Sequence, residues 1–90
     1  MAETTLTADG SFTQLNFPAP TAAVRLSGGF GGGTATISIK QGATGTNLTL
    51  DTATAAYDNE CVVGVGNTID VTLAGSTGAT LLIQIIPVRT

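Results

Sequence analysis

Residues 35–40, with the sequence ATISIK, decide the fold class of this chain. Apolar and polar side chains alternate along them with a period of two, which is the pattern of a β-strand with one buried face. The same alternation recurs at residues 24–26 (VRL), 48–51 (LTLD) and 69–73 (IDVTL), and breaks rich in Gly, Thr and Asn separate these runs. Short alternating runs between such breaks predict an all-β protein.

Turn residues place the other strands. The predicted strands, about eight in all, lie at residues 4–8, 12–17, 23–27, 34–40, 47–51, 61–65, 68–74 and 79–89. Asp9-Gly10 predicts a hairpin between the first two, because both residue types tolerate positive φ angles. Gly66-Asn67 predicts a second tight turn, between the sixth and seventh strands, and the longest connection is expected over residues 52–60.

Residues 1–90 are predicted to form a single domain, a two-sheet antiparallel sandwich with either a jelly-roll or an immunoglobulin-like topology. A domain of this length buries only somewhat over ~60% of its unfolded surface, so it is marginally stable by itself. The single Cys cannot form an intrachain disulfide, and without His there is no Cys/His zinc site. Oligomerisation is the remaining common way to stabilise so small a domain, and we therefore expect self-association.

Charge is scarce. Charged residues make up 10% of the chain, whereas about 25% is usual, and such a surface suits a protein that neighbouring subunits cover. The net charge of -3, with Arg25, Lys40 and Arg89 isolated, excludes the basic stripe that nucleic-acid binding needs. No apolar run approaches the ~18 residues of a membrane span, and the first residues do not resemble a secretory signal. The prediction is synthesis in the cytoplasm, with neither nucleic acid nor membrane as a partner.

Residue types that are common in active sites and cofactor sites are nearly absent from this chain. Cys61 and the serines have no His to act as a base. The acids Asp51, Asp58, Glu60 and Asp70 lack the tight alternating spacing of a calcium loop. The glycine-rich stretch, residues 28–33, precedes a predicted strand, whereas a phosphate-binding loop precedes a helix. We therefore predict no catalytic, cofactor-binding or metal site, and no enzyme.

The last strand carries the strongest functional signal. Leu81, Ile83 and Ile85 share one face of it, and the opposite face is also largely apolar. Either this strand is central in a layered fold or its outer face packs against another subunit, and the second interpretation is favoured. Apolar residues of the N-terminal hairpin offer both faces too, and the aromatic side chain of the glycine-rich stretch suits either the core or a subunit contact. The candidate interface residues are Phe12, Leu15, Phe17, Phe30, Leu82, Ile86 and Val88.

Three segments resemble the small all-β structural proteins of tailed bacteriophage virions, the head decoration or cement proteins. They are residues 3–10 (ETTLTADG), 23–37 (AVRLSGGFGGGTATI) and 75–80 (GSTGAT). The resemblance implies a non-enzymatic protein on the capsid surface, bound in many copies as a homotrimer or dimer and clamping subunits of the major capsid protein. The alternatives are another virion component, at the neck, tail or fibre base, and a carbohydrate-binding adhesin module.

Overall fold

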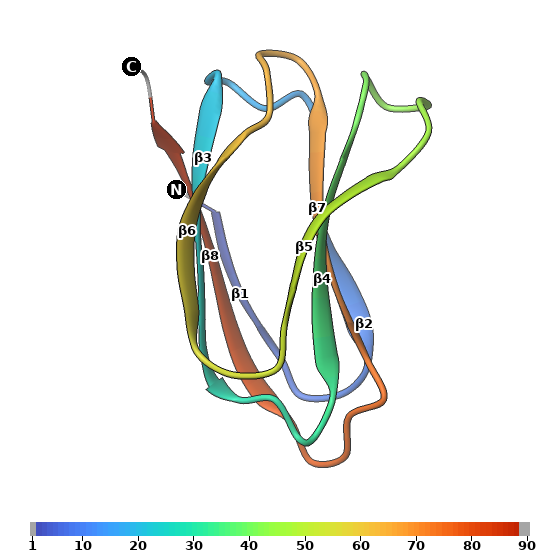
Figure 1. Cartoon of the computed structure of the whole chain (residues 1–90), viewed down its shortest axis with the longest axis vertical. Coiled ribbons are helices and arrows are strands. Elements are labelled where there is room, and N and C mark those ends of the chain that lie inside the picture. The colour runs from blue at the N-terminus through green and yellow to red at the C-terminus, as the bar shows by residue number, and fades with distance from the viewer. Residues whose placement is uncertain (1, 89–90) are drawn as a thin grey trace.

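The computed structural model describes residues 2–88, which form eight strands and no helix. The strands are β1 (Ala2–Leu6), β2 (Gly10–Gln14), β3 (Thr21–Gly29), β4 (Thr34–Lys40), β5 (Leu48–Ala53), β6 (Tyr57–Val62), β7 (Thr68–Ala74) and β8 (Thr80–Val88). Sheet A has the order β1-β8-β3-β6 and sheet B the order β2-β7-β4-β5. Figure 1 shows the two sheets edge-on as two layers. The predicted two-sheet antiparallel sandwich is confirmed.

The strand order is that of a jelly roll. β4 pairs with β5, β3 with β6, β2 with β7 and β1 with β8, so the chain forms one long antiparallel ribbon folded back at the β4–β5 turn. Two further pairings, β3 with β8 and β4 with β7, roll this ribbon into the two sheets. The immunoglobulin-like alternative has a different strand order, and the structure therefore decides between the two predicted topologies in favour of the jelly roll.

The core lies between the two sheets and follows the predicted alternation. Leu81, Ile83 and Ile85 of β8 are fully buried, as are Ile37 of β4 and Val71 of β7. Within residues 2–88 no helix is long and apolar enough to cross a bilayer.

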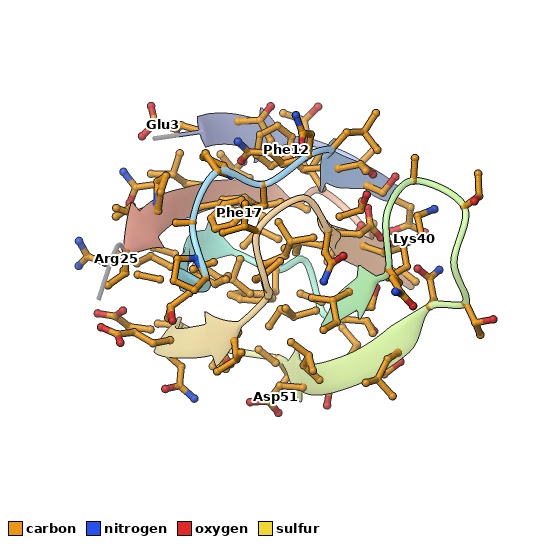
Figure 2. All side chains as sticks on the ribbon, turned by 90° about the horizontal axis from the view of Figure 1, so that it is seen from above. Glu3, Phe12, Phe17, Arg25, Lys40 and Asp51 are labelled. Carbon is orange, nitrogen blue, oxygen red and sulfur yellow. The ribbon has the colours of Figure 1, made fainter. Side chains whose placement is uncertain are left out.

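Two of the candidate interface residues belong to this core. Phe17 lies between the sheets, as Figure 2 shows, and has no exposed surface, while Phe30 is 6% exposed. Each sits in a connection that crosses from one sheet to the other, and its ring fills the end of the sandwich. The prediction that these two rings lie at a subunit interface is wrong, because both are covered within their own subunit.

The predicted N-terminal hairpin is also wrong. β1 and β2 follow one another in the chain but pair in different sheets, and the connection between them crosses the sandwich. The Asp9 carboxylate in this connection accepts hydrogen bonds from the backbone N–H groups of Gly75 and Ser76 and from the Ser76 hydroxyl. The Asp-Gly pair thus fastens the β1–β2 connection to the β7–β8 connection.

The predicted turn at Gly66-Asn67 is a crossing as well. β6 lies in sheet A and β7 in sheet B. The connection pairs with Phe17, whose N–H donates to the Asn67 carbonyl and whose carbonyl accepts from the Gly66 N–H, each over 2.9 Å. Among residues 2–88, the β4–β5 pair is the one hydrogen-bonded hairpin of consecutive strands.

Several strand boundaries differ from prediction, and the largest shift is that of β6. β6 covers residues 57–62 where 61–65 was expected, so most of the predicted long connection is strand. β3 continues through Gly28 and Gly29, because Gly28 adopts a φ of 93° and its Cα approaches β8 so closely that a Cβ atom would lie 2.4 Å from the Thr80 carbonyl oxygen. Gly28 thus lets the backbone of β3 approach that of β8 closely.

Candidate assembly surfaces

The outer face of sheet A is the surface of this sheet that points away from the core. Its central strand, β8, contributes Leu82, Gln84, Ile86 and Val88, which alternate with the buried inner residues and are all half-buried. Three of these four outward side chains are apolar. β3 flanks β8 along its whole length on one side, and β1 flanks it on the other side from Leu81 to Ile85.

A polar row crosses the outer face of sheet A at mid-height. The strand register aligns Glu3, Gln84, Arg25 and Asp58, one residue from each of the four strands. The Gln84 amide donates to Glu3 over 2.7 Å, and the Arg25 guanidinium lies 3.5 Å from the Asp58 carboxylate. The side chains of Arg25 and Asp58 remain 56% and 66% exposed, so both retain room for further partners. In Figure 2, Glu3 and Arg25 lie on the side of sheet A away from the core.

Beside this row lies an apolar patch, which we define as Ala23, Val62, Ile86 and Val88. Ala23 pairs with Ile86 in the register, and Thr21 stands between Val88 and Val62 in the next row. Val62 is 76% exposed, and the other three are half-buried. Glu60, opposite Ala23 on the edge strand β6, adds an exposed carboxylate to the border of the patch.

The outer face of sheet B has a different composition. One row across its four strands consists of Ser11, Thr72, Thr36 and Thr52, and the next consists of Thr13, Asp70, Ser38 and Thr49. The Thr13 and Thr72 hydroxyls both donate to the Asp70 carboxylate. This face presents mainly hydroxyl groups, two of which donate to Asp70, and these two rows contain no large apolar side chain.

The β5 and β6 edges border an opening along one side of the sandwich. A hollow of about 220 Å³ there is lined by Leu50, Asp51, Tyr57 and Cys61 among others. The Tyr57 hydroxyl donates to the Asp51 carboxylate over 3.0 Å and so connects sheet A to sheet B. Leu48 is well exposed on β5. The register of β4 with β5 shifts at Leu50, which has no partner between Ile37 and Ser38.

The pKa values of two groups at this opening are raised, which disfavours their deprotonated, reactive forms. Burial, followed by the hydrogen bond to Asp51, raises the pKa of Tyr57. Burial also raises the pKa of the Cys61 thiol, and the negative charge of Asp51 adds to it. A protonated thiol is a poor nucleophile. Residues 2–88 contain no group of three or more His, Cys, Asp or Glu residues placed to hold a metal ion.

The structure brings some of the predicted interface residues together and separates others. Ile86 and Val88 share the apolar patch, and Leu82 lies on the same face beyond the polar row. Phe12 is half-buried and packs against the core from β2, whereas Leu15 follows β2 and is 58% exposed. These two belong to sheet B and its connection, so they do not join the β8 residues in one surface.

Two members of the patch, Ala23 and Val62, were not predicted. Val62 was expected within a strand of residues 61–65, and its outward direction depends on the pairing of β6 with β3. A single sequence contains no signal for that pairing, because β6 and β3 are 28 or more residues apart in the chain.

Comparison with known proteins gives no relatives: no protein-family model, no curated protein and no solved structure matches this chain.

Proposed function

We propose that this chain is a non-enzymatic structural protein of a virion, a capsid decoration or cement protein that associates with copies of itself and stabilises the phage head. The observation that carries the proposal is the outer face of sheet A. It exposes an apolar patch beside a mixed-charge row, in a protein with few charges elsewhere. Exposed apolar patches bordered by polar groups are typical of protein–protein contact sites.

The energetic argument concerns the size of the domain. Burial of apolar surface contributes roughly 25 cal/mol per Å², and a 90-residue sandwich has little core to spare. Covering Val62, Ile86 and Val88 with a neighbouring protein removes apolar surface that the subunit leaves in water. Binding in many copies then converts modest single contacts into firm retention on a shell.

The jelly roll is compatible with this role. It occurs in viral capsid proteins, in lectins and in cupins, so the fold alone does not choose among these functions. The chemistry of this chain supports the structural one. With no His in the sequence, it lacks the usual metal ligand and general base of enzymes, and the protonated Cys61 thiol does not replace them.

The positions of the aromatic rings favour assembly over sugar binding. Sugar sites typically stack a ring of the sugar on an exposed aromatic side chain. The sequence holds one Tyr, three Phe and no Trp. Phe17 and Phe30 are buried, Phe12 packs on the core, and Tyr57 uses its hydroxyl to bond Asp51.

The proposed function is tested by measuring whether the protein binds to phage heads. Purified expanded heads of the virus whose genome encodes this chain, stripped of decoration, are mixed with the protein and sedimented. We expect saturable co-sedimentation in many copies per head, together with a higher melting temperature of the heads. Heads of an unrelated phage serve as the control. Failure to bind, with the melting temperature of the heads unchanged, contradicts the proposal.

A further inference from the structure

We infer that the free edge of β6 binds an extended segment of another protein as an additional strand of sheet A, and that this segment alternates cationic with apolar side chains. The inference goes beyond the proposed function, because it concerns a sheet edge and not the outer face, and because it gives the chemistry of a partner other than a copy of this chain. Its tests use no heads, so its failure and the failure of the proposed function are distinguishable.

The backbone of β6 is a regular template for another strand. Within residues 2–88, β6 pairs with β3 alone, and their register contains no shift. Figure 1 shows β6 toward the viewer, at the edge of its sheet. On the neighbouring edge strand, β5, the register is interrupted at Leu50, and such a bulge disturbs the regular order of backbone groups. An added strand therefore finds continuous pairing on β6 and not on β5.

The alternation of the ladder shows which backbone groups of β6 are free. In an antiparallel pair, every second residue directs its N–H and C=O to the neighbouring strand, and the residues between direct theirs away from it. The N–H of Val63, directly after β6, donates to the Pro20 carbonyl, directly before β3, over 2.9 Å. By alternation from Val63, the residues Asp58, Glu60 and Val62 direct their backbone groups to the free edge.

One of these free groups has a local partner that agrees with this direction. The Glu60 N–H donates to the exposed side chain of Asn59, its own neighbour in the chain, over 2.9 Å. A strand beside β6 offers a carbonyl oxygen in place of this exposed amide. In strand addition, backbone hydrogen bonds of this kind supply the affinity, and pockets for alternate side chains supply the specificity.

A pocket of the required kind lies along the same edge, the hollow of about 220 Å³ described above. Its lining includes Glu60 and Val62, which point outward from β6, and Cys61, which points inward opposite the buried Ala22. Because residues of both faces of β6 border the hollow, it occupies the place of a strand beside β6. The inward side chains of that strand would contact Cys61 and Leu50, so apolar residues suit these positions.

The charges at this edge select a cationic segment. Asp58 and Glu60 are exposed on the outer face of β6, and the exposed Asp51 of β5 borders the same hollow. Arg25, the cation that the register places on this face, lies 3.5 Å from Asp58 and offsets one of the three acids. Opposite charges directly across a pair of strands stabilise the pair. Lys or Arg is therefore favoured opposite Asp58 and Glu60.

A second copy of this chain does not supply such a segment. Its cations, Arg25, Lys40 and Arg89, are far apart in the sequence, so no stretch of strand length contains two of them. Acids on an edge strand also oppose pairing with the same edge of another copy. The acids of β6 thus disfavour self-pairing and favour a cationic partner, and specificity arises from repulsion and attraction together.

The first test measures binding of the synthetic peptide Ser-Val-Val-Lys-Val-Lys-Ser, blocked at both ends, whose two Lys residues antiparallel pairing sets opposite Glu60 and Asp58. NMR titration should give saturable binding with a Kd below about 1 mM and the largest amide shifts at residues 58–62. The same peptide with Glu in place of Lys should bind at least about 10-fold more weakly. Glu60→Lys should weaken binding of the Lys peptide by at least about 10-fold, whereas the control Ser11→Lys, on the edge strand β2 of sheet B, should not weaken it.

The second test separates strand addition from attraction between charges alone. In this register the N–H groups of both Lys residues of the peptide face β6, and the N–H of the Val between them faces away. N-methylation of both Lys residues removes donors to β6 and should weaken binding at least about 10-fold. N-methylation of that Val should change the Kd by less than about two-fold, because its N–H has no partner on β6.

Three results would overturn the inference. The first is no saturable binding of the Lys peptide at about 1 mM. The second is binding that Glu60→Lys leaves unchanged or that the two N-methylations affect equally. The third is a shift of the amides of residues 58–62 on dilution of the protein without peptide, which would show that a second copy occupies this edge. Circular dichroism checks that both variants are folded, and head binding by the wild-type protein decides the proposed function in every case.

Discussion

The central strands β8 and β7 hold equivalent places in the two sheets, yet their outward faces differ in chemistry. β8 presents Leu82, Ile86 and Val88 with one amide between them, whereas β7 presents hydroxyl and carboxylate groups such as Thr72 and Asp70. Both strands bury their other face in the same core. The difference therefore does not arise from folding of the subunit, which needs only the inner faces.

This contrast indicates that the outer face of sheet B is suited to contact with solvent. Thr has a high β-propensity and suits a solvated pleated surface. The outer rows of sheet B consist mainly of Thr and Ser, so they favour the strand conformation and expose no large apolar side chain. On the outer face of β8, by contrast, three of the four residues are apolar. Apolar residues at these positions are explained by a surface that another protein covers.

The largest effect is expected where one substitution is made on the two faces of β8. Ile85→Lys places an ammonium group at a fully buried position and should remove about 4 kcal/mol or more, most of the stability of a domain of this size. Ile86→Lys changes the next residue, which is half-buried, and should leave a folded protein. Urea unfolding followed by circular dichroism measures both. Equal destabilisation by the two would contradict the assignment of Ile86 to an outer surface.

A second experiment removes the difference between the faces. The triple variant Leu82→Thr, Ile86→Thr, Val88→Thr gives β8 an outer face like that of β7. Because Thr is compatible with strands, we expect a folded protein whose self-association is weaker by at least about 100-fold, or ~2.7 kcal/mol. Sedimentation velocity over a concentration series provides the measurement. The matched triple variant Thr34→Val, Thr36→Val, Thr72→Val on sheet B should keep the wild-type self-association.

The sequence predicted the parts of the fold that depend on local pattern. Alternation in residues 35–40 and 69–73 placed strands and their inner faces correctly, because side-chain direction in a strand follows the period of two. Strand partners were not predictable in this way. The Asp9-Gly10 pair has the chemistry of a hairpin turn, but Asp9 bonds Gly75 and Ser76, which are 66 and 67 residues away. The competing long-range contact decided the geometry.

The candidate surface was predicted only in part, because alternation along a strand is visible in the sequence and strand pairing is not. Both apolar faces of β8 were visible in the sequence, and the structure places Ile86 and Val88 outward as a pair. Aromatic residues misled the prediction, because Phe17 and Phe30 lie in crossings whose direction depends on the topology. Val62 and Glu60 reach the surface through the register of β6 against β3, and one sequence by itself gives no information on that register.

A third prediction concerns the close packing of β3 against β8, on which the outer face of sheet A depends. Gly28→Ala should cost about 2 kcal/mol or more, because φ is 93° and the new Cβ would lie 2.4 Å from the Thr80 carbonyl oxygen. Gly75→Ala shares the positive φ but has open space, so we expect a loss of only about 1 kcal/mol. Chemical denaturation compares the two, and equal losses would mean that the approach of the strands is easily relaxed.

The smallest effect is expected at Asp9, which connects the two sheets and belongs to neither outer face. Hydrogen bonds from Ser76 hold the pKa of the Asp9 carboxyl below its ordinary value of 3.8. The folded state therefore binds this proton less readily than the unfolded chain does, and the stabilisation is complete well above pH 3.8 and is lost as the pH falls below it. Asp9→Ala should lower the melting temperature at pH 7 by less than Gly75→Ala does, and the difference from wild type should shrink as the pH falls below 3.8. Self-association at pH 7 should not change, because Asp9 lies outside the outer face of sheet A. A loss of self-association in this variant would show that the contact depends on how the sheets are joined.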